Sequence, residues 1–198
     1  EFKVNISTSA NILYKILPAP HFLIKDSKIL VDDDKKRIAE IKNLRVFLGQ
    51  KNFFNKEKIN FKKVVISDAN ITLLVSDFKL LNKSKNKNFS NKKINIANSN
   101  IFFEDNLGDI ISFIKITKGF LFFDEKKLLN LFNLKGKVFN IPFIFNFKYQ
   151  NNFDKNKEIN LNFKSLKLNI FNKSSTKKNK FITGENIISF LNSKINTK

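Results

Sequence analysis

The hydrophobic residues of this chain recur at every second position over most of its length, which is the spacing of a β-strand with one apolar face. In the longest example, 139–149, apolar or aromatic residues fill every odd position. At 3.3 Å per residue, this segment predicts a strand roughly 36 Å long. Shorter stretches with the same alternation begin at Ile12, Leu44, Ile71 and Ile159. The pattern therefore predicts a mainly β fold with many strands.

Helical spacing of the apolar residues occurs at only two places. Asp124 is suited to cap a helix over 125–133, and a second short helix is expected to begin at Thr183 or Gly184. The alternation also changes phase at Ser165, which a β-bulge would explain. One or two short helices cannot cover the apolar face of about ten strands. That face must therefore meet another sheet, another chain or a ligand.

Three segments, 24–31, 66–73 and 96–103, share one order of residue types. Each places an Asp or Asn and then a small residue between a branched residue and a new apolar run. The Asp or Asn side chain can bond to nearby backbone and redirect the chain, while the small neighbour permits a sharp bend or a close approach of strands. We expect a bend in each segment, although ordinary β-turn chemistry would also produce this repetition. A hairpin loop is expected at 104–109.

The positive charge of the chain has two interpretations. The 198 residues include 37 Lys and Arg against 17 Asp and Glu, which gives a net charge of +20. Arg37 and Arg45 are the only arginines, although nucleic-acid sites favour the guanidinium group. Abundant Lys, Asn, Ile and Phe are also typical of an AT-rich genome. We therefore expect no specific nucleic-acid partner; the charge is either compositional or attracts anionic lipid headgroups.

The residue types needed for most catalytic sites are missing. Cys is absent, His21 is the only histidine, and the five glycines form neither a Walker loop nor a dinucleotide fingerprint. His21 follows Pro20 and is expected to be an exposed turn residue. The acidic segments 32–34 and 104–109 are expected to be solvated turns without a metal ion. We therefore predict a protein that is not an enzyme and uses no cofactor or metal.

Three segments in order, 17–29, 38–48 and 59–73, resemble the N-terminal region of the AsmA family of bacterial envelope proteins. The segments 96–104 and 124–147 continue in the same style, so the resemblance covers most of the chain. This family is similar to TamB and to bridge-like lipid-transfer proteins. The resemblance implies an extended, twisted antiparallel sheet that is curled into an open, taco-like groove, with residues 1–198 forming a single region.

The resemblance also implies a place in the cell. Members of the family lie in the periplasm, are anchored in the inner membrane by an N-terminal helix, and are implicated in moving phospholipid toward the outer membrane. This sequence opens on alternating residues rather than on Met, and it has no run of about 18 apolar residues that would span a bilayer. We therefore expect it to be a fragment whose anchor lies upstream, with phospholipid, membrane and envelope proteins as partners in outer-membrane biogenesis.

The chemistry of an apolar groove is consistent with an acyl-chain ligand. Phe accounts for 24 residues while Trp and Met are absent, so the apolar face would be broad and without polar tips. The alternative is a closed β-sandwich that serves as a structural or interaction module, with the same residues in a sealed core and no lipid ligand. The candidate lining residues are Ile71, Leu73, Val75, Phe139, Ile141, Phe143, Phe145, Phe147, Leu161 and Phe163.

Overall fold

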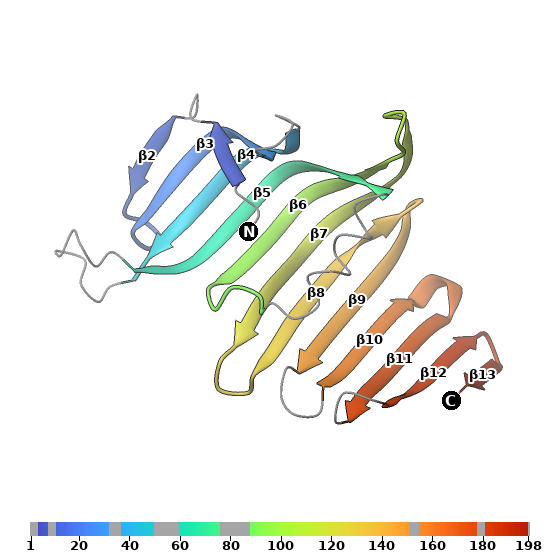
Figure 1. Ribbon diagram of the computed structural model, residues 1–198. Helices are drawn as coiled ribbons and strands as arrows, with labels where there is room; N and C mark the ends of the chain where they lie inside the picture. The colour runs from blue at the N-terminus through green and yellow to red at the C-terminus, as the bar shows by residue number, and fades with distance from the viewer. Residues whose placement is uncertain are drawn as a thin grey trace.

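The chain forms one open β-sheet (Figure 1). The computed structural model describes residues 4–7, 11–31, 37–49, 60–75, 88–150, 155–177 and 181–197. The prediction of a mainly β fold is confirmed. The strands are β1 (Val4–Ser7), β2 (Ile12–Lys15), β3 (His21–Val31), β4 (Arg37–Leu48), β5 (Phe61–Leu74), β6 (Lys93–Glu104), β7 (Ile110–Asp124), β8 (Leu129–Val138), β9 (Ile141–Gln150), β10 (Lys155–Phe163), β11 (Leu168–Lys177), β12 (Phe181–Phe190) and β13 (Ser193–Thr197).

The strands follow one another across the sheet in chain order from β3 to β13. At the first edge, β1 pairs with the second half of β3 and β2 pairs with its first half. Neighbouring strands are antiparallel except for β5 and β6, which are parallel. The expectation of an antiparallel sheet therefore holds for every described pair but this one.

The expected short helices are wrong, because no α-helix occurs in the described part of the chain. Asp124 does accept hydrogen bonds from the N–H groups of Lys126 (3.1 Å) and Lys127 (3.2 Å), as a cap would. The chain then turns at 125–128 and continues as β8, which pairs with β7 and β9 along its length. Thr183 lies in β12, between β11 and β13. Pairing on both sides has overridden the local helical spacing in both segments.

Two loop predictions have different outcomes. The loop between β6 and β7 is the expected hairpin: Asp105 Oδ1 accepts the N–H groups of Leu107 (2.8 Å) and Asp109 (3.0 Å), and Gly108 has a φ of +91°. The phase change at Ser165 is a turn rather than a bulge. A 3-10 turn, Lys164–Leu166, separates β10 from β11.

The three repeated segments each bend the sheet at their Asp or Asn. Asp26, Asp68 and Asn98 have left-handed backbone, with φ of 54°, 57° and 48°. The small residues that follow them, Ser27, Ala69 and Ser99, are at most 1% exposed. The expected bends are therefore present on β3, β5 and β6.

The bends form one line across the sheet because their strands are in register. Ser27 pairs with Ile41 and Ile41 with Ala69. Next, the Ala69 N–H donates to Ser99 Oγ (3.1 Å), and Ser99 pairs with Ile116 of β7. We call Ser27, Ile41, Ala69, Ser99 and Ile116 the buried row. Each is at most 2% exposed.

The carboxylate of Asp68 on β5 is hydrogen-bonded to side chains on both neighbouring strands, β4 and β6. Its Oδ1 accepts a hydrogen bond from Asn98 Nδ2, and its Oδ2 accepts one from Asn43 Nδ2 at 3.0 Å. These bonds, Asn98 first and Asn43 second, lower the pKa of Asp68 from its ordinary value of 3.8, and the charges of Lys42 and Arg45 add to the effect. The ionised form of Asp68 is therefore favoured in the folded chain.

Asp68→Asn is expected to make the free energy of unfolding depend less on pH in the acid range. Because folding lowers the pKa of Asp68, its contribution is present above the unfolded pKa and is lost as pH falls through the folded pKa. Asn tolerates the same left-handed backbone but can accept only one of the two bonds. The parent chain should be the more stable at neutral pH, and the difference should shrink in strong acid. Urea unfolding followed by circular dichroism measures this; a difference that stays constant with pH would contradict it.

Candidate functional site

One face of the sheet carries an apolar row that runs from the first edge to the last. The register of the strands aligns a continuous row of residues on this face, and every member except Gly119 has an apolar side chain. We call it the apolar row, and the side of the sheet that carries it the apolar face. The apolar row is Ile12, Ile24, Leu44, Ile66, Ile96, Gly119, Leu134, Phe145, Leu161, Ile170, Ile188 and Ile195.

Side chains on this face form two packed clusters. The first is centred on Ile41, Leu44 and Ala69 of β4 and β5. The second is centred on Ile96, Ile116, Leu134 and Phe143 of β6 to β9. In the second cluster, the ring centroids of Phe132 and Phe145 lie 5.7 Å apart, and those of Phe143 and Phe163 lie 6.1 Å apart. The apolar face is therefore closely packed in the middle of the sheet.

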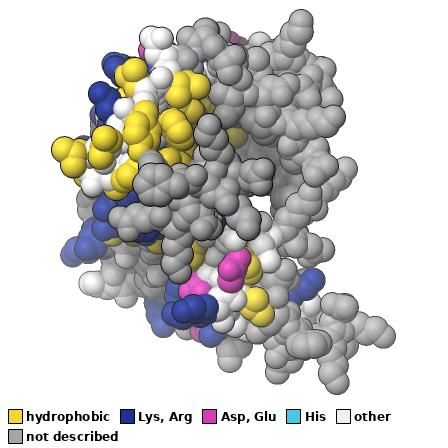
Figure 2. Space-filling model, turned by 90° about the vertical axis from the view of Figure 1, so that its left-hand side faces the viewer, with side chains coloured by type: hydrophobic (Ala, Val, Ile, Leu, Met, Phe, Trp, Pro, Cys, Tyr) yellow, Lys and Arg dark blue, Asp and Glu magenta, His cyan; other side chains and the backbone are white. Residues whose placement is uncertain are grey.

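Towards the edges of the sheet the apolar face becomes exposed. Ile12 is 58% exposed on β2, and Ile188 and Ile195 are 43% and 62% exposed on β12 and β13. Figure 2 shows hydrophobic side chains gathered near the β2 edge. Surface of this kind at the ends of a packed face is available for contact with an apolar molecule.

Eight of the ten candidate lining residues lie on the apolar face. Ile71 and Leu73 are on β5, in line with the first cluster, and Leu161 and Phe163 are on β10 beside the second. The other four are Ile141, Phe143, Phe145 and Phe147 on β9. The structure does not bring all of the predicted set together: one residue packs against the first cluster and four lie in or against the second. These are Ile71 for the first, and Phe143, Phe145, Leu161 and Phe163 for the second.

Phe139 and Val75 do not belong to this face. Val138 pairs with Ile141, so Phe139 and Asn140 form a two-residue turn with φ of 48° and 63°. Phe139 is 70% exposed at the tip of this hairpin. Val75 follows the last residue of β5 and is 44% exposed.

Most of the apolar row was not predicted from the sequence. Leu44, Ile66, Ile96, Leu134 and Ile188 lie on the same line across the sheet as Phe145. Their strands show the same alternation, but the register that aligns them depends on pairing between distant segments. Period-two spacing identifies which residues of one strand share a face. It does not identify which residues of neighbouring strands are aligned in a row.

The segment 88–92, which leads into β6, covers one end of the apolar face. The Phe89 N–H donates to Oδ1 of the buried Asn130 (2.7 Å), and the Phe89 ring lies 6.3 Å from that of Phe147. Asn130 Nδ2 also donates to Asn88 Oδ1 (3.2 Å), and the Phe123 N–H donates to Ser90 O (2.9 Å). This segment therefore closes the β7 to β9 end of the face.

The opposite face carries polar and charged pairs together with some aromatic side chains, such as Phe102 and Phe113, whose ring centroids lie 6.2 Å apart. Asn133 bonds to Asn146 across β8 and β9, and Lys148 Nζ lies 3.1 Å from Glu158 Oε2. Among the residues described, no three His, Asp or Glu side chains form a group that could hold a metal ion. The segments described also include no helix that is long and apolar enough to cross a membrane.

His21 is buried rather than exposed, so the expectation for it is wrong. It is the first residue of β3 and is 4% exposed. Its Nδ1 lies 2.7 Å from Ala19 O, and its ring stacks on Phe47 with centroids 4.8 Å apart. These contacts give His21 a structural role at the start of the strand.

Comparison with known proteins adds no relative to this picture. No protein-family model matches the chain, and no curated protein matches it.

Proposed function

We propose that this chain is a non-enzymatic envelope protein of AsmA type that binds the acyl chains of phospholipid on its apolar face. In this proposal the sheet curls into an open groove on the periplasmic side of the inner membrane. The groove carries lipid toward the outer membrane and thereby supports outer-membrane biogenesis. The apolar row is the observation that supports the proposal most strongly, because it crosses the sheet from β2 to β13 at right angles to the strands.

The energy of lipid transfer explains the need for such a row. Each CH₂ group exposed to water costs about 0.8 kcal/mol, so a chain of about 16 carbons costs on the order of 12 kcal/mol. An uninterrupted apolar strip can offset most of that cost at every point along it. Strands lie about 4.8 Å apart, so a strip at right angles to them meets a new apolar side chain at about that interval.

A charge placed on the apolar row is expected to prevent lipid binding. Phe145 is half-buried in the middle of the row, between Leu134 and Leu161. Phe145→Glu would put a carboxylate against the acyl chain, and desolvating it is unfavourable. Lipid recovered with the purified chain, measured by mass spectrometry after extraction, should fall at least about tenfold, which corresponds to 1.4 kcal/mol.

The matched control is Ile144→Glu, one residue away on the opposite face and also half-buried. This variant should keep its lipid, and Phe145→Leu should keep it as well. Circular dichroism should show a β spectrum for all three variants. Loss of the β spectrum only in Phe145→Glu, or absence of lipid from the parent chain, would favour the closed module instead.

The alternative of a structural interaction module has its own support. Ile16 and Leu17, which follow β2, are 67% and 83% exposed. Apolar side chains at the edge of a sheet favour contact with another protein. Capture of a protein partner by a chain that carries no lipid would distinguish this module from the lipid-binding protein.

A further inference from the structure

The apolar face changes character between β10 and β12. The row beside the apolar row begins with Phe147, which pairs with Ile159. On the next two strands this row continues with Asn172 and Asn186, and Asn172 Nδ2 donates to Asn186 Oδ1 (2.5 Å). In the line beyond, Tyr149 pairs with Lys157, and Lys157 pairs with Ser174. The apolar face is thus polar at one end of these strands.

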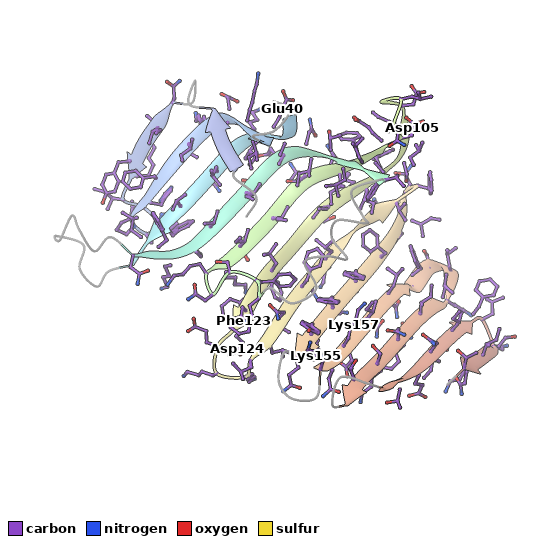
Figure 3. All side chains as sticks on the ribbon, in the orientation of Figure 1. Glu40, Asp105, Phe123, Asp124, Lys155 and Lys157 are labelled. Carbon is purple, nitrogen blue, oxygen red and sulfur yellow. The ribbon has the colours of Figure 1, made fainter. Side chains whose placement is uncertain are left out.

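Two lysines lie at this polar end. Lys155 and Lys157 alternate with the polar-face residue Glu158, so they share the apolar face with Ile159. Figure 3 shows both at the end of β10 that lies toward Phe123 and Asp124, away from Asp105. Both are half-buried, while Lys135, Lys137, Lys148 and Lys173 of the neighbouring strands are exposed.

The acidic residues of this region lie on the other face. Glu158 pairs across the strands with Lys148, and Glu185 pairs with Lys173. Among the described residues of β8 to β12, no carboxylate lies on the apolar face. The half-buried Lys157 therefore places a positive charge at this end of the apolar face.

We propose that Lys157 binds the phosphate of an anionic phospholipid whose acyl chains lie on the apolar row. This inference rests on the proposed function and adds a headgroup class to it. Lys157 and Ile159 are two residues apart on one face, a separation of about 7 Å, so one lipid molecule reaches both the lysine and the apolar side chains. The Ser174 hydroxyl, beside Lys157, is placed to donate a further hydrogen bond to a phosphate oxygen.

The test measures displacement of a fluorescent phospholipid from the 198-residue chain at low ionic strength. The competitors are phosphatidylglycerol, phosphatidylcholine and diacylglycerol of the same acyl chains, together with inorganic phosphate. We expect phosphatidylglycerol to compete best and inorganic phosphate not to compete. In Lys157→Gln its advantage over diacylglycerol should fall about fivefold, since a lysine near an anionic headgroup contributes about 1 kcal/mol.

The control, Lys135→Gln, removes the same charge from an exposed position on the opposite face. It should bind every lipid as the parent does. An equal loss in the control, equal binding of phosphatidylglycerol and diacylglycerol by the parent, or competition by inorganic phosphate alone would overturn the headgroup site. Binding of none of the lipids would overturn the proposed function itself, so the two failures are distinguishable.

Discussion

Gly136→Ala is expected to destabilise the fold more than any other single methyl addition to a described strand glycine. A Cβ at Gly136 would lie 2.3 Å from the backbone oxygen of Lys115 and 3.2 Å from Cε1 of Phe143. The Lys115 oxygen belongs to the ladder between β7 and β8, so it cannot retreat without breaking strand pairing. Overpacking of this kind costs about 3 kcal/mol, a large share of the stability of a small domain.

The comparison variant is Gly184→Ala in β12. Its Cβ would lie 3.2 Å from the nearest atom, Lys173 O, so a small adjustment accommodates it. Urea unfolding followed by circular dichroism should show a much lower midpoint for Gly136→Ala than for Gly184→Ala. Equal midpoints would mean that β7 and β8 separate easily at Gly136, contrary to the close packing of the second cluster.

Period-two spacing was sufficient to predict the apolar face of individual strands. Phe143, Phe145 and Phe147 alternate with polar residues in the sequence and lie on one face of β9 in the structure. The same rule failed at Phe139, because the alternation continues through a turn. Two-residue hairpin turns usually contain Gly, and the pair Phe139–Asn140 has none to mark it.

The sequence contains a signal for the parallel pairing of β5 and β6. Every pair between these strands joins residues 30 positions apart, such as Ile66 with Ile96 and Asn70 with Asn100. The segments 66–73 and 96–103 repeat with this same offset. Repetition alone does not establish pairing, because the third repeat, 24–31, pairs with β4 instead. The repeat therefore predicted the bends but not their alignment.

The two wrong helices and the half-buried lysines have a common cause. Local spacing near Asp124 favours a helix, and local composition near Lys157 favours a solvated strand face. In the structure, both segments are determined by their neighbours: β8 by pairing on both sides, and Lys157 by its position beside Tyr149 and Ser174. Pairing between distant strands cannot be predicted from the local residue pattern of a single sequence.

Ile116→Ala is expected to lower stability by about 4 kcal/mol, because large-to-small changes at fully buried positions lose both contacts and volume. Ile116 is 0% exposed. It ends the buried row on β7, between Ser99 of β6 and Gly136 of β8, and belongs to the second cluster. The residues around it belong to paired strands, so they cannot close the cavity that the substitution leaves.

The control is Ile111→Ala on the same strand, where the side chain is 56% exposed. It removes the same atoms from a site that keeps most of its contact with water, so its urea midpoint should stay close to that of the parent. Since the buried row joins the line of bends to the second cluster, Ile116→Ala should also weaken lipid retention, whereas Ile111→Ala should not. If both variants unfold at the same urea concentration, the buried row does not hold the bent strands together.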